Sequence, residues 1–155
     1  MQKEINRQVL KKGLSNQSLA IIPKIKEVDD YMQAHKEYAD ILCESHPELC
    51  FARLNGAVLQ TKKSSVVGAE ERVGILSKYI KDERLDSTFS LAKELECKPD
   101  DILDAACLAV TAALKAHNMS EAIPEKPEKD AEGLPMQMIV PKNHFMVSVT
   151  GYRCS

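Results

Sequence analysis

The apolar segment at residues 102–116 constrains the fold more than any other part of this chain. Twelve of its fifteen residues are apolar, and the interruptions are Asp104, Thr111 and Lys115. A helix that is apolar on nearly every side must be covered by several neighbouring elements. The segment is shorter than the roughly 18 residues that a membrane span needs. It therefore predicts a helix packed on several sides inside a folded domain.

The rest of the composition is that of an ordinary globular domain. The chain has 155 residues, of which 44% are hydrophobic and 28% charged, so one domain is expected. The net charge of -2 excludes a strongly basic coat for nucleic acid, although it leaves room for a local basic patch. The first residues, Met1 to Glu4, are polar and lack the apolar core of a signal peptide. A cytoplasmic location is therefore expected.

The cysteines predict buried thiols rather than a metal or disulfide framework. There are five of them, at positions 43, 50, 97, 107 and 154, and no two are spaced as C-x-x-C. Cys43, Cys50 and Cys107 lie in apolar runs. These three are expected to be small residues of the core.

Helical spacing of apolar residues predicts a helix that begins near Ser15 or Asn16. One apolar stripe follows at that spacing: Ile21, Ile25, Val28 and Met32. Pro23 lies within the stripe. It must either kink this helix or mark the first turn of a helix that begins later.

Turn and break signals divide the rest of the chain. Residues 41–51 are apolar at both ends and are broken by Pro47, which predicts a strand, a break and a second extended stretch through Leu54. Asn55-Gly56 then predicts a tight turn. Further along we expect helices at 68–80 and 87–95, a charged loop at 120–132, a strand at 136–140 and an unassigned tail at 141–155.

Two aspartates of the long helix are the first candidate site residues. Asp101 and Asp104 are three residues apart, which places both carboxylates on one helix face. The helix dipole accounts for an acid at the start of the helix, as at Asp101. It accounts poorly for Asp104, because a carboxylate against an apolar surface costs free energy unless a cation or hydrogen-bond donors compensate. From spacing alone, a structural role and a metal-binding role are equally open.

The other candidates are individually weak. On a strand, Glu44 and His46 would face the same side, although a solvated acid and a structural histidine explain them equally well. Lys62 and Lys63 follow the Asn-Gly turn, where a solvated loop is the simplest interpretation, and Lys24 has the same status. Such lysines gain significance only beside carboxylates that bind a metal and act on phosphodiesters.

Several short segments, taken in order along the chain, resemble one protein family. Residues 13–29 read GLSNQSLAIIPKIKEVD, and residues 44–51 read ESHPELCF. Further matches are Asn55-Gly56, Lys62-Lys63, Gly68 with Glu71-Arg72, residues 100–106 (DDILDAA) and residues 133–139 (GLPMQMI). Together they resemble the motifs of a family of predicted ribonuclease-H-like nucleases that was formerly a domain of unknown function. The D-x-x-D-A spacing also resembles that of RuvC-type junction resolvases.

The resemblance implies an α/β fold of the ribonuclease-H-like type, with a mixed sheet flanked by helices, over residues 1–140. It implies hydrolysis of phosphodiester bonds with Mg²⁺ or Mn²⁺. By the same resemblance, three carboxylates would ligate the metal: Glu44, Asp101 and Asp104. Three lysines would hold the phosphates of a nucleic acid: Lys24, Lys62 and Lys63. His46 would orient Glu44 or assist proton transfer.

The family begins with a strand that carries a catalytic Asp in a GIDG context, and we find no counterpart here. The chain is therefore expected to lack the first strands of the sheet, and it stays open whether it is an active enzyme. One alternative is a metal-dependent nuclease-like protein that is impaired or incomplete. The other is a non-catalytic interaction module, or a split subunit, whose open sheet edge is covered by a protein partner or by another copy of the chain. A small-molecule phosphatase using the same acids is a third.

Overall fold

The computed structural model describes residues 15–143 of the chain. The chain divides into two compact units, Met1–Leu42 and Cys43–Ser155. The described residues form five α-helices, α2 to α6, with one short 3-10 helix and two β-strands. The expected α/β class is confirmed, whereas the single domain over residues 1–140 stays a prediction. Cys154 and residues 144–155 of the unassigned tail lie outside the described residues.

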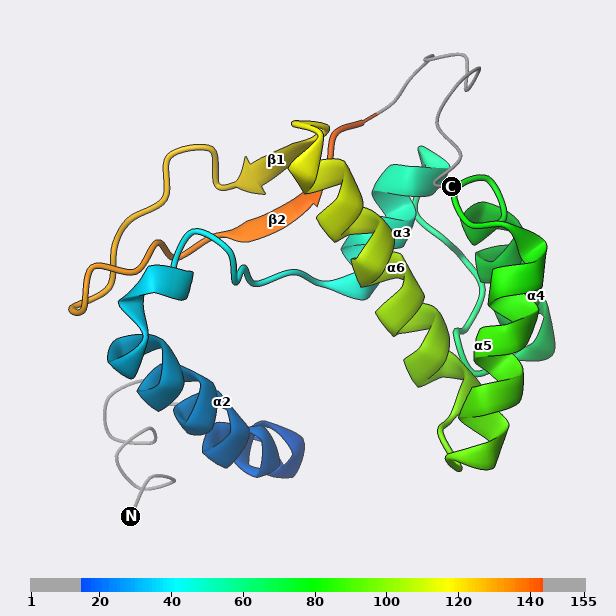
Figure 1. The fold of residues 1–155 in the computed structure, drawn as a ribbon, viewed down its shortest axis with the longest axis horizontal. Helices are drawn as coiled ribbons and strands as arrows, with labels where there is room; N and C mark the ends of the chain where they lie inside the picture. The colour runs from blue at the N-terminus through cyan, green and yellow to red at the C-terminus, as the bar shows by residue number, and fades with distance from the viewer. Residues whose placement is uncertain (1–14, 144–155) are drawn as a thin grey trace. The chain divides into compact units, whose positions relative to one another are not determined.

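The first unit is built around helix α2, Asn16–Ala34 (Figure 1), which is followed by the 3-10 helix η1, Lys36–Tyr38. Ser15 caps α2, because its hydroxyl accepts a hydrogen bond from the amide of Ser18 at 3.0 Å. Pro23 lies inside α2, beyond its first turn. The interpretation in which Pro23 starts a later helix is therefore wrong.

The apolar stripe of α2 is buried at one end only. Met32 is buried, and near it in sequence the ring of Tyr31 lies 4.4 Å from that of His35 and 6.0 Å from that of Tyr38. The other three residues of the stripe are exposed: Ile21, Ile25 and Val28. Most of the stripe is thus an uncovered apolar surface.

Helix α6, Pro99–Ala116, contacts every other named helix and strand of the second unit. They are α3, α4, α5, β1 and β2. Leu103, Cys107 and Val110 of α6 are buried in the core. The hydroxyl of Thr111 is also buried, and it donates a hydrogen bond to the carbonyl of Cys107 at 2.9 Å. The prediction of a helix packed on several sides is confirmed.

The segment expected to be strand, break and strand is instead largely helical. Helix α3 spans Pro47–Asn55, with Pro47 in its first turn. Proline is favoured there, because its fixed φ suits a helix and its missing N–H would be unbonded anyway. Gly56 ends α3 at a φ of 77°, so Asn55-Gly56 is a helix end and not a hairpin turn. The predicted second extended stretch and tight turn are wrong.

The residues before α3 are extended but belong to no named strand. The carbonyl of Glu44 accepts a hydrogen bond from the amide of Ile139 at 2.8 Å. The hydroxyl of Ser45 donates to the carbonyl of Ile139 at 2.7 Å. This segment therefore lies along β2, although the expected alternation of Glu44 and His46 on a regular strand is not found.

The remaining elements follow the sequence more closely. Helix α4 spans Val66–Leu76 and overlaps the helix expected at 68–80. Helix α5 spans Asp82–Glu94 and overlaps the helix expected at 87–95. Strand β2, Met138–Pro141, overlaps the expected strand at 136–140. It pairs antiparallel with β1, Ser120–Ile123, in a two-stranded sheet. Because β1 lies within residues 120–132, the expectation of a loop throughout that range is wrong.

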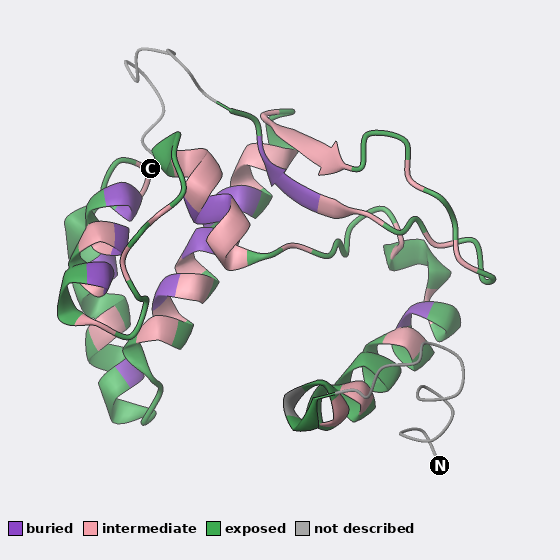
Figure 2. Ribbon diagram, turned by 180° about the vertical axis from the view of Figure 1, so that it is seen from behind, coloured by how far each residue is buried: buried purple, intermediate pink, exposed green. Residues whose placement is uncertain are grey.

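Buried residues of the second unit occur on α3, α4, α5, α6 and β2, whereas the surface of α2 is mainly exposed (Figure 2). Cys50 and Cys107 are both buried, as expected for small core residues. Cys43 is exposed, so its assignment to the core is wrong. Cys43 comes just before the extended residues that contact β2, and it does not lie within a buried strand. No helix of residues 15–143 is long and apolar enough to cross a membrane.

A buried charge joins α3 to α4. The Arg72 side chain is 2% exposed, and its guanidinium donates to both carboxylate oxygens of Glu48, at 2.7 and 2.8 Å. It also donates to the carbonyl of Gly68 at 2.9 Å and lies 5.4 Å from the centre of the Phe51 ring. Nη2 makes both bonds to Glu48 and Nη1 makes the bond to Gly68, so the planar guanidinium serves two partners at once, and the Phe51 ring face adds a favourable cation contact.

Replacing Arg72 with Ala should lower the free energy of unfolding by about 2–4 kcal/mol, because Glu48 and the Gly68 carbonyl lose their donor. Arg72→Lys should recover only part of this loss, since an ammonium lacks the planar fork. Arg84→Ala, at an exposed position of α5, is the control and should change stability by less than about 0.5 kcal/mol. Urea unfolding measures all three, and equal values for Arg72→Ala and Arg84→Ala would contradict this account.

Candidate functional site

Lys63 and two aspartates of α6 form the charged cluster that the structure brings together. The ammonium of Lys63 donates to Oδ2 of Asp104 at 3.0 Å. Oδ2 of Asp100 lies 3.8 Å from the same ammonium. Asp100 and Asp104 are four residues apart, which places them on one face of the helix. Two of the predicted site residues, Lys63 and Asp104, are therefore neighbours.

Asp104 is the least solvated acid of this cluster. Its side chain is 20% exposed, and its Oδ1 atom is buried without a hydrogen-bond partner among the described residues. A buried acceptor left unpaired costs about 1–3 kcal/mol. A cation or a donor placed at Oδ1 would recover that cost.

The neighbouring acids change the pKa of the Lys63 ammonium. The hydrogen bond to Asp104 and its negative charge raise the pKa of the Lys63 ammonium, with smaller contributions from Asp100 and Glu48. Because the lysine pKa is raised, this contact stabilises the fold below the ordinary lysine pKa, as long as the carboxylates are ionised, and that stabilisation is lost as the pH rises through the raised pKa. Lys63 therefore remains a full positive charge beside these carboxylates at neutral pH.

A tight loop positions Lys63. The carbonyl of Lys62 accepts hydrogen bonds from the amide and the hydroxyl of Ser65, at 3.0 and 2.7 Å. The Ser65 hydroxyl in turn accepts from the amide of Gly68 at 3.0 Å, which caps α4. A Cβ at Gly68 would lie 2.0 Å from the Lys62 carbonyl oxygen. Only glycine allows the loop to approach α4 this closely.

The sequence analysis missed Glu48 and Asp100. Glu48 lies in the first turn of α3, where it pairs with Arg72, and its charge contributes to the raised pKa of Lys63. The spacing of Asp100 and Asp104 by four residues was a signal that could have been used. Glu48 could not be found in this way, because its segment was expected to be extended.

Among the described residues of the second unit, no hydrogen bond or ion pair joins this cluster to the other predicted site residues. Asp101 is an exposed residue of α6, next to Asp100. Glu44 and His46 are exposed, in the extended segment and at the start of α3. Lys62 is exposed in the loop, and Lys24 belongs to α2 in the first unit. Their functional roles stay predictions.

Within residues 15–143, no three His, Cys, Asp or Glu side chains are grouped so that they could hold a metal ion by themselves. A closed protein cage is therefore not formed by the described residues. A pair of carboxylates that shares a metal with water and substrate oxygens is a different kind of site, and Asp100 with Asp104 is such a pair.

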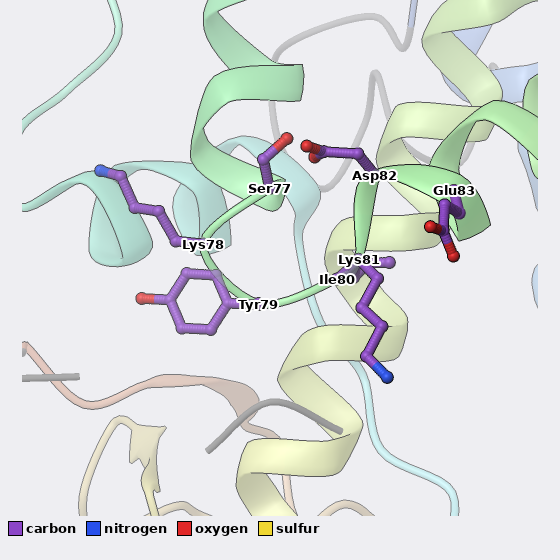
Figure 3. Close-up of a pocket in the computed structure, with 7 residues that line it drawn as sticks. All are labelled: Ser77, Lys78, Tyr79, Ile80, Lys81, Asp82 and Glu83. Carbon is purple, nitrogen blue, oxygen red and sulfur yellow. The ribbon is translucent and has the colours of Figure 1, made fainter. Parts of the chain in front are cut away.

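A shallow pocket lies between α4 and α5 (Figure 3). It is lined by one continuous segment: Ser77, Lys78, Tyr79, Ile80, Lys81, Asp82 and Glu83. The labelled side chains point in several directions and do not converge on a common centre. None of them is a predicted site residue, so this pocket adds nothing to the charged cluster.

Comparison with protein families assigns the chain to one family. A family model described as "Protein of unknown function (DUF429)" matches residues 1–129. The chain belongs to this family. The matched range includes Lys63, Asp100 and Asp104, so the charged cluster lies within the family domain. Comparison with curated proteins found no match, and comparison with solved structures found none either.

Gly68→Ala should destabilise the protein by about 1–3 kcal/mol, because the new methyl group would clash with the Lys62 carbonyl and push the loop away. Gly74→Ala, also within α4, is the matched control. A Cβ there meets nothing within 4 Å, so this variant should gain about 0.5–1 kcal/mol from helix propensity. Thermal unfolding distinguishes the two, and a Gly68→Ala variant as stable as Gly74→Ala would contradict the loop geometry.

Proposed function

We propose that Asp100 and Asp104 bind a Mg²⁺ or Mn²⁺ ion, and that the chain carries part of a ribonuclease-H-like site for hydrolysis of phosphodiester bonds in nucleic acid. The observation that supports this most is Oδ1 of Asp104, which is buried on a largely apolar helix and has no hydrogen-bond partner among the described residues. A divalent cation would supply the compensating charge that this oxygen lacks.

The ligand chemistry fits a hard cation. Carboxylate oxygens favour Mg²⁺ and Mn²⁺ over the softer metals that thiolates select. Mg²⁺ is usually held by one or two carboxylates together with water and substrate phosphates, rather than by a closed protein cage. Asp100 and Asp104 meet that requirement without a third protein ligand. When bound, the ion would activate water and stabilise the leaving oxygen of a phosphodiester.

Lys63 has two roles in this proposal. Its ammonium pairs with Asp104 and, at longer range, with Asp100. A divalent cation at the same carboxylates competes with the ammonium, which would then be available to a phosphate oxygen of the substrate. Lys62, the next residue in the loop, would add a second phosphate contact.

The remaining predicted residues would act when substrate is bound. Glu44 and Asp101 would ligate a metal once substrate is bound. His46 would orient Glu44 or carry a proton, and Lys24 would contact phosphate. Their support is the family resemblance of the segments that contain them.

A second candidate is a non-catalytic module that docks on a protein partner. It is favoured by one observation: β1 pairs with β2 along one edge, and no other strand among residues 15–143 pairs with the far edge of β1. The far edge of β2 already contacts the segment before α3, because the Glu44 carbonyl accepts a hydrogen bond from the Ile139 amide. An open strand edge can accept a strand from a partner or from another copy of the chain. This candidate requires no metal, which separates it from the first.

Titration with Mn²⁺, followed by calorimetry, tests the first candidate. Asp104→Asn should weaken binding by about tenfold or more, because it removes charge from the site. Lys63→Gln should tighten binding, because the competing ammonium is gone. Asp86→Asn, at an exposed position of α5, is the control and should leave binding unchanged.

Affinity for a short oligonucleotide provides the functional readout. Mn²⁺ should strengthen oligonucleotide binding by the wild-type chain, and Lys63→Gln should weaken that binding although it tightens Mn²⁺ binding. Equal Mn²⁺ affinities for the wild-type, Asp104→Asn and Asp86→Asn proteins would contradict the proposal and favour the docking module.

A further inference from the structure

We propose that α2 pairs in parallel with α2 of a second copy of this chain, forming a short two-stranded coiled coil. The proposal concerns the first unit only and does not rest on the metal site. It starts from the stripe of apolar residues that the structure leaves mostly uncovered.

The spacing of the stripe is that of a coiled-coil seam. Its residues are Ile21, Ile25, Val28 and Met32. The intervals alternate between four and three residues, as they do at the inward positions of a heptad repeat. Ile21, Ile25 and Val28 are 47%, 59% and 61% exposed. Burying this seam against an identical helix would remove three large apolar side chains from water in each copy.

On the opposite face of α2, an ion pair within the helix already satisfies two charged side chains. Lys26 donates to both carboxylate oxygens of Asp30, at 2.6 and 2.7 Å, so this ion pair is closed within the helix. Pro23 lies on the same side as Asp30, seven residues away. The proline and the internal ion pair therefore lie away from the seam and do not obstruct it.

The charges beside the seam select the second copy and its direction. Lys24 precedes Ile25 on one flank of the seam, and Asp29 follows Val28 on the other. In a parallel coiled coil, a flanking residue that directly precedes a seam residue, as Lys24 does, faces the residue five places later in the partner helix. Lys24 of each copy would then face Asp29 of the other. In an antiparallel pair, the flank that carries Lys24 would face the same flank of the partner helix, so this attraction would be lost.

The side chain of Asp29 is already held near its place. Its carboxylate accepts a hydrogen bond from Nε2 of Gln33 at 2.9 Å, one helical turn further on. This contact involves one oxygen and leaves the carboxylate an acceptor with further capacity. Lys24 is an exposed residue of α2.

The mass of the full-length chain in solution, measured by sedimentation across a range of concentrations, tests the proposal. The wild-type chain should form a dimer. Ile25→Lys should weaken dimerisation by about tenfold or more, because it places a charge in the seam. Ala20→Lys adds the same charge at an exposed position off the seam and should leave the dimer intact.

A charge exchange distinguishes pairing with a second copy from packing of α2 elsewhere on the same chain. Lys24→Glu alone and Asp29→Lys alone should each weaken the homodimer, because each variant places like charges opposite one another. An equal mixture of the two variants should form a heterodimer, because every flanking pair then has opposite charges. A monomeric wild-type chain, an assembly of three or more chains, or a mixture without preferred heterodimers would overturn the proposal.

Discussion

The burial of α6 on several sides is the constraint on which the second unit depends. A helix with Leu103, Cys107 and Val110 in the core needs α3, α4, α5 and the two strands around it. The same packing fixes where its polar residues can lie. Asp100 and Asp104 fall on the rim of the packed helix, one turn apart, and Asp104 is held partly out of water. The candidate site is thus a consequence of how the core is built.

Two of the ion pairs in the second unit bear on the candidate site. Arg72 of α4 holds Glu48 of α3, and Lys63 of the loop before α4 holds Asp104 of α6. The first pair includes a guanidinium that is almost fully buried, so its loss should destabilise the fold by about 2–4 kcal/mol. The second is more exposed, and an exposed ion pair contributes little stability. A pair that adds little to the fold can be exchanged for a metal at small cost, which is the property that the proposed function requires.

The sequence predicted the elements whose periodicity dominates and failed where local chemistry decides. The apolar run at 102–116 left no alternative to a buried helix. At residues 47–55, Pro47 indicates a break between strands, although proline is also a favoured first residue of a helix. For the site, the charge of Lys63 and the burial of Asp104 were anticipated. The pairing of Asp100 with Lys63 and of Glu48 with Arg72 depends on contacts between distant segments, which no spacing along one helix reveals.

The most direct test of the central claim is to locate a bound Mn²⁺ ion by its paramagnetic broadening of NMR signals. Broadening falls steeply with distance from the ion, so it maps the site residue by residue. The account predicts that the first signals to disappear are those of Asp100, Asp104 and Lys63, while those of the exposed Asp86 persist. Loss of signals around other acidic residues first, or no selective loss at any Mn²⁺ concentration, would contradict a metal site on this face of α6.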